Sequence, residues 1–285
     1  MIKVFYNPLQ SAVKNESYSP SAMKPRLVAE AFSQFSAVSI DESFAPLSIE
    51  DLSKVHDPKY VTGVLNCSVP NGFGNRLPEI AATLPWTSGS MYAAAIGAIA
   101  EGVAVSPTSG FHHASFSAGS GFCTFNGLMA TAVKLLNSGY SKVGILDLDA
   151  HYGDGTEDII ERLKLQSSIP HYTFGKEFRF YSSERAWLDS LERSITTLFS
   201  GCDVVLFQAG ADPHKDDPLG GMLTTEAIRE RDQIVFNTLK TKKIPCAWNL
   251  AGGYQKPIEK VIALHVNTLM QCILAFEFSA RLHRK

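Results

Sequence analysis

The chain has 285 residues, a net charge of −2 and an apolar fraction of 45%, which suits one large globular domain better than two small ones. With a pI of about 6.4 and no block of like charges, the composition argues against direct nucleic-acid binding. The five cysteines are too widely spaced for a zinc knuckle. Their odd number argues against a disulfide framework and favours a reducing, cytoplasmic location.

The beginning of the chain predicts a strand. Residues 1–6 form an apolar run that is too short for a signal peptide. Residues 84–105 form the longest stretch of low charge, but Pro85 and Glu101 argue against a membrane span, so we expect no membrane association. We interpret residues 88–101 as a buried amphipathic helix.

Four short apolar runs alternate with helical patterns in the rest of the chain. Each run is apolar on both faces and is closed by a Gly-rich or polar segment, which is typical of buried parallel strands. The predicted strands are residues 102–106, 143–149, 203–208 and 244–250, and the predicted helices are residues 126–137, 156–165, 183–199 and 225–240. Thr224 or Thr225 is a suitable N-cap for the last helix. The alternation predicts a single-domain, three-layer α/β fold over residues 1–285, with a mostly parallel sheet flanked by helices.

Unusual polar residues follow each of these predicted strands. His112 and His113 come after the first strand, residues 147–154 come at the end of the second, and Asp212 and Tyr254 follow the third and fourth. In an open parallel sheet, ligands bind outside the carboxyl ends of the strands. The sequence therefore predicts that four separate segments contribute to one site.

The second of these segments has the pattern of a metal site. Asp147, Asp149 and His151 alternate along the chain, so an extended backbone places them on one face. Carboxylate and imidazole ligands together suit Zn²⁺ or Fe²⁺ better than Mg²⁺ or Ca²⁺. Asp212 follows an apolar strand and small residues, and it is the natural third ligand. These aspartates could instead be helix caps or turn formers, an interpretation that suits one of them better than the whole group.

Two further segments have the residues of an acid–base site. His112 and His113 lie in a Gly-rich loop, and a carboxylate that orients either ring would suit a general base acting on water. Tyr254 follows Gly252 and Gly253, which allow a sharp turn that directs the phenol over the strand ends. A phenol there can donate to a tetrahedral oxyanion. Exposed histidines and a tyrosine packed at a turn are the alternatives.

The order and spacing of these motifs over residues 1–275 resemble the histone deacetylases and their bacterial acetyl-amide hydrolase relatives, within the arginase/deacetylase superfamily. The resemblance implies three zinc ligands, with Fe²⁺ as an alternative ion: Asp149, His151 and Asp212. It implies that His113, paired with Asp154, is the general base and then the general acid. It also implies that His112, paired with Asp147, is an electrostatic companion and that Tyr254 stabilises the transition state.

The resemblance further implies a substrate tunnel and a second ion. Gly121 and Phe122 would form part of a narrow tunnel for an acyl-lysine-like stem, with Gly252 and Gly253 also at the substrate. A structural K⁺ would lie near Asp147, Asp149 and His151. The implied reaction removes an acetyl or longer acyl group from an N-acetylated amine, such as an acetyl-lysine peptide or an acetyl-polyamine. The oligomeric state is left open.

The chain departs from the family pattern around the substrate rim. Tyr152 replaces a second histidine, and Leu250 and Ala251 replace two members of the glycine run. The segment at residues 19–22 replaces an early His-Pro-Glu motif. Residues 173–183 lack the Pro-Gly loop that carries the second tunnel aromatic, for which the candidates are Phe178, Phe180 and Tyr181.

Two other functions are alternatives to amide hydrolysis. An arginase-like hydrolase with two Mn²⁺ ions needs a carboxylate two residues after His151, where this chain has Gly153, and Asp154 comes one residue later. A non-catalytic protein that binds acylated ligands or a partner would not need an intact ligand set, base and tyrosine. Both alternatives are less consistent with the sequence.

Overall fold

The computed structural model describes residues 1–13 and 16–277, so the last eight residues of the predicted domain, 278–285, lie outside the described residues. Within this part of the chain, seven strands form one sheet in the order β2-β1-β3-β7-β6-β4-β5. Every pairing in the sheet is parallel. The strands are β1 (Ile2–Phe5), β2 (Val38–Asp41), β3 (Val103–Ser106), β4 (Val143–Asp147), β5 (His171–Thr173), β6 (Val204–Gln208) and β7 (Cys246–Asn249). The predicted α/β fold with a mostly parallel sheet is confirmed.

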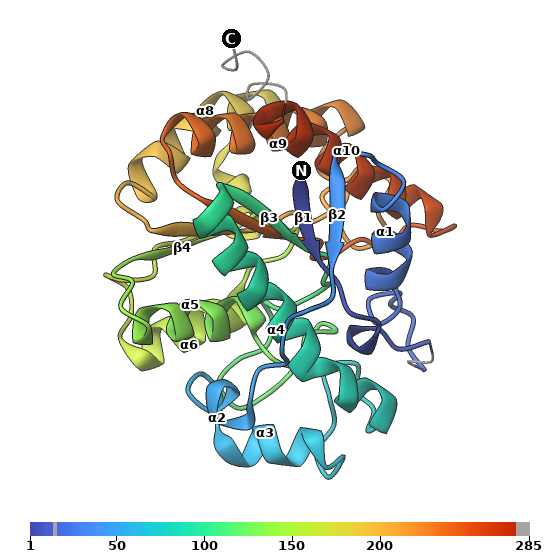
Figure 1. Ribbon diagram of the computed structural model, residues 1–285. Helices are drawn as coiled ribbons and strands as arrows, with labels where there is room; N and C mark the ends of the chain where they lie inside the picture. The colour runs from blue at the N-terminus through green and yellow to red at the C-terminus, as the bar shows by residue number, and fades with distance from the viewer. Residues whose placement is uncertain (14–15, 278–285) are drawn as a thin grey trace.

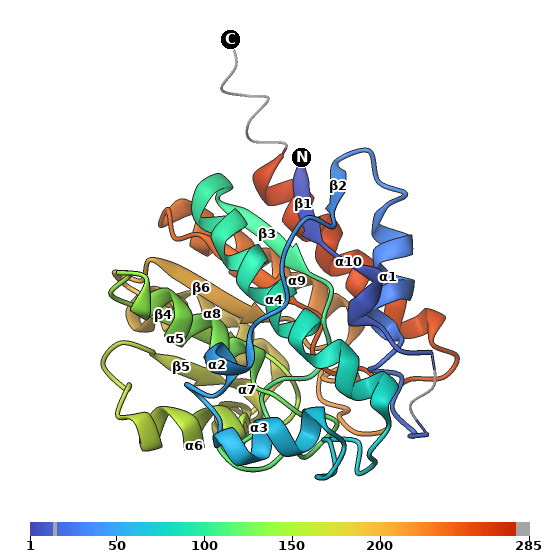
Figure 2. The ribbon, with the colours of Figure 1, turned by 60° about the horizontal axis from the view of Figure 1, so that its bottom comes forward.

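Helices cover both faces of the sheet and complete three layers (Figures 1 and 2). The strands have side chains on both faces: Val103 and Val105 point into one apolar cluster, while Ala104 points into the other. The first cluster lies under α1 (Lys24–Phe32), α8 (Glu184–Leu198), α9 (Thr225–Thr241) and α10 (Glu259–Phe276). The second lies under α3 (Pro58–Leu65), α4 (Pro78–Glu101), α5 (Gly127–Asn137) and α6 (Asp154–Leu163). Short elements complete the chain: η1 (Pro8–Gln10), α2 (Ile49–Leu52), α7 (Phe174–Glu177) and η2 (Phe178–Phe180).

The longest helix differs from its prediction. We expected a helix over residues 88–101, whereas α4 begins at Pro78 and continues through Pro85. A proline removes one intrahelical donor, and the carbonyl of Pro85 still accepts a hydrogen bond from the amide of Leu47, at 3.0 Å. Packing on both sides of α4 therefore outweighs the local effect of the proline. None of the helices in residues 1–13 and 16–277 is long and apolar enough to cross a membrane.

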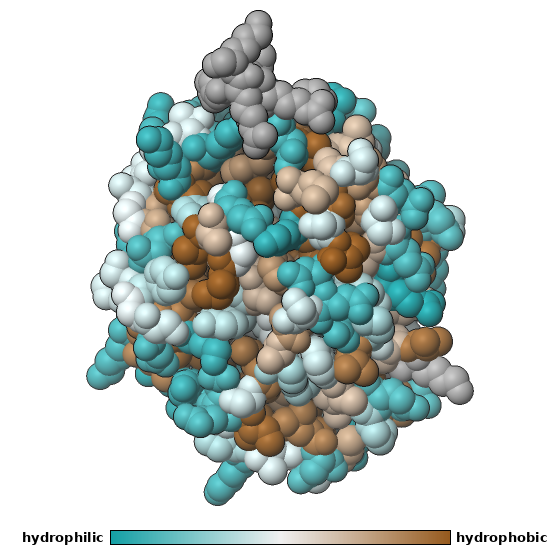
Figure 3. Space-filling view, in the orientation of Figure 1, coloured by the Kyte–Doolittle hydropathy of each residue, from teal (hydrophilic) through white to brown (hydrophobic). Residues whose placement is uncertain are grey.

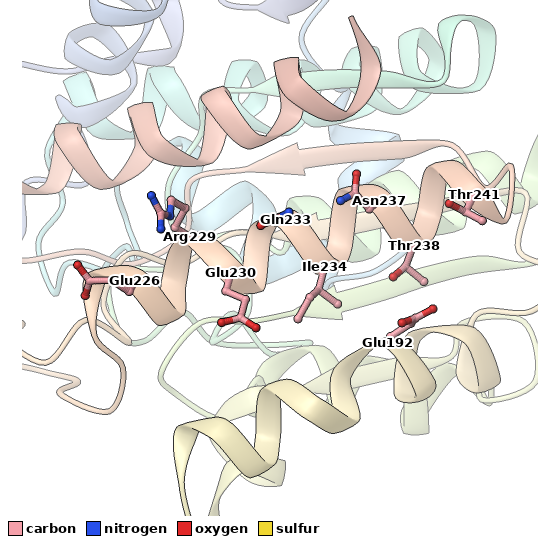
Figure 4. Close-up of a pocket in the computed structure, with 9 residues that line it drawn as sticks. All are labelled: Glu192, Glu226, Arg229, Glu230, Gln233, Ile234, Asn237, Thr238 and Thr241. Carbon is pink, nitrogen blue, oxygen red and sulfur yellow. The ribbon is translucent and has the colours of Figure 1, made fainter. Parts of the chain in front are cut away.

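The outer surface mixes polar and apolar side chains. On the face shown in Figure 3, hydrophilic and hydrophobic residues are interspersed over α4 and its neighbours. A polar groove runs between α8 and α9 and is lined by Glu192, Glu226, Glu230 and their neighbours (Figure 4). Because none of the residues singled out by the sequence lines this groove, the chemistry has to be sought at the sheet.

Candidate metal and acid–base site

The carboxyl ends of β3, β4, β6 and β7 bring the four predicted segments together. Asp149, His151 and Asp212 offer three ligand atoms that lie within 4.8 Å of one another. His151 Nδ1 is 3.1 Å from Asp149 Oδ1 and 3.0 Å from Asp212 Oδ2. The Ala150 amide donates to Asp212 Oδ1 at 3.2 Å, and this hydrogen bond joins two residues that lie 62 positions apart in the sequence.

The donor set fits a divalent cation. The two carboxylates are buried, with Asp149 2% and Asp212 0% exposed, and two buried anions side by side need a compensating positive charge. Burial and the charge of Asp149 raise the pKa of Asp212, and hydrogen bonds to both carboxylates raise the pKa of His151 to about 11. Burial would raise the pKa of Asp149 as well, but the charge of His112 and the hydrogen bond of His151 hold it well below its usual range. Two carboxylates and one imidazole are ligand types that divalent transition-metal ions accept.

Gly252 closes the site from the side of β7. Its amide donates to Asp149 Oδ2 at 2.8 Å. A Cβ at this position would lie 2.2 Å from Asp212 Oδ2, so only glycine fits. The structure thus places Gly252 against the carboxylates of Asp149 and Asp212, while its predicted contact with substrate stays a prediction.

The first histidine lies in a buried charge network. His112 Nδ1 is 2.7 Å from Asp147 Oδ2, and both side chains are buried. Asp147 Oδ1 also accepts from Gln208 Nε2 at 2.9 Å, which fixes the carboxylate. Burial alone would lower the pKa of His112, but the charges of Asp147 and Asp149 outweigh it and raise the pKa to about 9.

The second histidine faces a different environment. His113 Nδ1 is 2.7 Å from Asp154 Oδ1, and that carboxylate is 57% exposed. Burial and the charge of His112 lower the pKa of His113. Two adjacent histidines are therefore driven to opposite protonation states, as in acid–base pairs whose environments separate their pKa values. Gly121 allows this arrangement, because a Cβ there would lie 2.4 Å from His113 Cδ2.

Tyr254 is nearly buried, and its ring lies 5.6 Å from that of Phe122. Burial and the charges of Asp212 and Asp149 raise the pKa of Tyr254 well above its usual range. The phenol is therefore kept protonated, as a hydrogen-bond donor must be. The Tyr254 amide donates to Asp217 Oδ2 at 2.7 Å, which fixes the turn.

The choice of a second tunnel aromatic among Phe178, Phe180 and Tyr181 stays a prediction. Phe178 and Tyr181 are both partly buried against the first apolar cluster, and the ring of Phe178 lies 4.7 Å from that of Phe174 and 6.0 Å from that of Trp187. Phe180 is 69% exposed. The ring of Phe73, which the sequence did not single out, lies 5.9 Å from that of Phe122, and both side chains line one small cavity.

Two donors that the sequence did not indicate hold the loop before Tyr254. Lys24 is fully buried, and its Nζ donates to the Ala251 carbonyl at 2.6 Å. Ser109 Oγ donates to the same oxygen at 2.7 Å. Ala251 has a left-handed backbone, with φ of +53°. Burial lowers the pKa of Lys24 to about 8. Ala251, which replaces a member of the glycine run, was the only signal in the sequence that other side chains have to hold the backbone of this loop.

The parallel sheet, covered by helices on both faces and with a carboxylate–imidazole group at its carboxyl edge, defines a three-layer α/β protein with a candidate metal site. The fold is shared with two solved structures at 18% sequence identity. The HDA15 HD domain has a TM-score of 0.75, and the match covers 95% of this chain and 88% of that one. An acetylpolyamine aminohydrolase from Burkholderia pseudomallei has a TM-score of 0.70, with 96% and 99% covered.

This chain belongs to the family described as "Histone deacetylase domain", whose family model matches residues 21–181 and 166–269. It is 29% identical to an uncharacterized protein of Picosynechococcus over 75% of this chain and 78% of that protein. It is 30% identical to histone deacetylase 2 of Arabidopsis thaliana over 59% and 48%. It is 26% identical to the acetylpolyamine amidohydrolase of Mycoplana ramosa over 51% and 50%. The matches thus span about half the length of the last two relatives.

Proposed function

We propose that this protein hydrolyses the N-acyl bond of an acetylated amine and uses one divalent cation, Zn²⁺ or alternatively Fe²⁺. Asp149, His151 and Asp212 would hold the ion, which supplies Lewis-acid activation of water and of the amide carbonyl when bound. The observation that carries the proposal is the convergence of this ligand group with two His–Asp pairs and a protonated tyrosine. Either ion is consistent with the donor set.

The chain's own residues would move the protons. His113, neutral because its pKa is lowered, takes a proton from the attacking water and passes it to the leaving amine. Tyr254 donates its phenolic proton in a hydrogen bond to the oxyanion of the tetrahedral intermediate. His112, kept charged by Asp147, stabilises negative charge close to His113 and does not itself transfer a proton.

A single catalytic ion is favoured over a two-manganese cluster by the position of Asp154. Its carboxylate faces His113 rather than the ligand group. Gly153 stands where the second metal would need a carboxylate, and a Cβ there would lie 2.7 Å from Asp147 Oδ2. We also propose a structural K⁺ near Asp147, Asp149 and His151, by resemblance to the family. The cytoplasmic location stays a prediction.

The substrate class is an acetyl-polyamine or an acetyl-lysine peptide, both acylated primary amines. This choice is supported by the family and by the names of the relatives. A screen of acetate release from both classes, run with Zn²⁺ and with Fe²⁺, tests it. If the metal-loaded protein releases no acyl group from any of these substrates, the proposed reaction is rejected.

Two variants test the roles of the base and the phenol. We expect His113→Ala and Tyr254→Phe to lower kcat by about 100-fold or more, with metal still bound. Tyr140→Phe, which alters a tyrosine outside this group, is the matched control and should keep its activity. Near-normal kcat in either test variant would remove that residue from its proposed role.

A further inference from the structure

The two segments that carry the carboxylate ligands separate at the end of the sheet. β4 and β6 stay in register up to the pair Asp147 and Gln208, and the last backbone–backbone hydrogen bond between their segments in the described part of the chain runs from the Leu148 amide to the Gln208 carbonyl at 3.0 Å. The pairing of β6 with β7 continues one residue past β6, where the Ala209 amide donates to the Asn249 carbonyl at 2.9 Å. The ladder between the two segments therefore ends just before Asp149 and Asp212.

Beyond the ladder, the Ala150 amide still bonds to the Asp212 carboxylate, and one buried side chain, that of Arg231, bonds to backbone carbonyls of both segments. Arg231 lies on α9 and is 1% exposed. Its Nη1 donates to the Gly210 carbonyl at 2.7 Å and to the Leu148 carbonyl at 3.2 Å. These carbonyls lie one residue before Asp149 and two residues before Asp212, so a single guanidinium nitrogen spans the point where the strands part.

The charge of Arg231 is balanced next to it. Its Nε donates to Asp232 Oδ1 at 2.8 Å, and Nη2 is 2.8 Å from the same oxygen. Asp232 Oδ2 accepts from Thr268 Oγ1 on α10 at 2.6 Å. A buried ion pair contributes little net stability compared with apolar residues of similar volume. What apolar residues could not supply is the pair of hydrogen bonds to Leu148 and Gly210.

We propose that Arg231 is a positioning residue that sets the spacing of Asp149 and Asp212, and thereby the affinity and geometry of the divalent-metal site. This inference rests on the metal site of the proposed function. Groups that orient metal ligands by hydrogen bonding to them typically lower metal affinity by about 10- to 100-fold when they are removed. Arg231 would act in this way through the backbone that carries the two ligands.

The first test is Arg231→Lys, which keeps the charge but replaces the planar fork with a compact ammonium group. The dissociation constant for Zn²⁺ is measured by competition with a chromophoric chelator, and ligand geometry by the visible absorption of the Co²⁺-loaded protein. We expect Zn²⁺ binding to weaken about tenfold or more and the Co²⁺ spectrum to change. The double variant R231M/D232N removes both charges together and should show the same loss without leaving a buried unpaired carboxylate.

Thr268→Val is the matched control. It removes the partner of Asp232 on α10 and leaves the bonds from Arg231 to Leu148 and Gly210 in place. We expect Thr268→Val to lower the melting temperature of the metal-free protein. The Zn²⁺ dissociation constant should stay within about twofold of that of the wild type, well short of the 10- to 100-fold effect of losing an orienting group. The Co²⁺ spectrum should be unchanged.

Two outcomes would overturn the proposal: wild-type affinity in both Arg231→Lys and R231M/D232N, or an equal loss of affinity in Thr268→Val. Because these measurements need no substrate, they separate the inference from the reaction. A wild-type protein that binds one Zn²⁺ but releases no acyl group would reject the proposed reaction only. A wild-type protein that binds no divalent ion would reject both.

Discussion

The pKa values of the neighbouring His112 and His113 shift in opposite directions: burial and the charge of His112 lower that of His113, while buried carboxylates raise that of His112. Asp147 is fully buried beside His112, whereas Asp154 is largely exposed beside His113. A buried carboxylate stabilises a charged imidazole strongly, and an exposed one does so weakly. The same two residue types therefore produce, at neutral pH, a charged ring and a neutral ring at adjacent positions.

Asp154→Asn should move the pH profile in a defined direction. The hydrogen bond and charge of Asp154 raise the pKa of His113, so their loss lowers that pKa further. A general base works in its neutral form, and activity is lost as pH falls through its pKa. We therefore expect the acid limb of kcat/KM to move to lower pH, with kcat reduced about tenfold because the ring is no longer oriented.

The matched control for this change lies one helical turn away on α6. Asp158 accepts from the Phe116 amide and does not contact His113. Asp158→Asn should keep the acid limb of the wild type. An acid limb that moves to higher pH in Asp154→Asn would contradict the role of His113.

Lys24→Met tests the support of the loop before Tyr254. A left-handed residue other than glycine costs about 1–2 kcal/mol, and Lys24 and Ser109 offset that cost by holding the Ala251 carbonyl. We expect kcat to fall about tenfold, equivalent to about 1.4 kcal/mol, and to recover in part when Ala251→Gly is added.

The control for the lysine is remote from the site. Lys142 Nζ donates to the Ser200 carbonyl at 2.8 Å in the loops that precede β4 and β6. Lys142→Met should leave kcat unchanged. If Ala251→Gly gives no recovery in the Lys24→Met background, the loop is not what Lys24 supports.

The convergence of the candidate site residues could be predicted from the sequence, whereas the side chains that hold their backbone in place could not. Asp149, His151, Asp212 and Tyr254 each follow an apolar strand, and the rule that parallel strands meet at their carboxyl ends is enough to bring them together. Lys24 and Arg231 reach the same region from helices. A cation in an amphipathic helix has no local feature to distinguish a buried position from a solvated one.

At the scale of the elements, the predictions succeeded where flanking signals were local. Thr224 caps α9, with its side chain accepting from the Ala227 amide at 3.1 Å. The edge strands β2 and β5 were not predicted, because edge strands are short and lack the apolar pattern of strands buried on both faces. The predicted start of α4 was wrong, because Pro85 and the small residues beside it resemble a helix end.

The start of α5 depends on a buried histidine. His56 is fully buried, its Nδ1 lies 2.8 Å from the Ser115 carbonyl, and its Nε2 accepts from the Asn126 amide at 2.8 Å. Asn126 is the N-cap of α5. Since Nε2 must accept a hydrogen bond, the ring has to be neutral, and burial lowers the pKa of His56 to about 4.

The free energy of unfolding should therefore fall as the pH is lowered from about 6.5 to about 4. The unfolded chain binds a proton near pH 6.5, whereas folded His56 does not until about pH 4, so the unfolded state gains as pH falls between these values. The loss reaches about 3 kcal/mol at most. Urea unfolding at pH 7.5 and pH 5 measures it.

His56→Gln isolates this contribution. Gln can accept from the Asn126 amide without titrating, so the variant should lose less stability between the two pH values than the wild type does. Burial also lowers the pKa of His171 to about 4, and that contribution is common to both proteins. An equal loss in the variant and the wild type would remove His56 as the cause.

At the scale of the whole molecule, metal binding and stability should be linked. The carboxylates of Asp149 and Asp212 converge only in the folded chain, so an ion held there binds the native state. At an ion concentration about 1,000 times the dissociation constant, this linkage adds about 4 kcal/mol. We expect a chelator to lower the melting temperature by about 10 °C.

Returning a stoichiometric amount of Zn²⁺ should restore the melting temperature, and Asp212→Asn should be insensitive to chelator. Metal analysis of the restored protein should give one ion per chain. Two manganese ions per chain would instead favour the arginase-like alternative.

The position of β7 in the sheet has a consequence for how the protein is made. β7 is the last strand in the described part of the chain, yet it lies between β3 and β6 and links the two halves of the sheet. During synthesis, β1–β3 and β4–β6 leave the ribosome before the strand that joins them, and each half has an open edge until then. Unpaired edges attract other strands. A nascent chain that stalls before Cys246 would therefore be the form most in need of a chaperone. The candidate residues that follow β3, β4 and β6 would lie on two half-sheets that cannot yet meet, and Tyr254 would not yet be made.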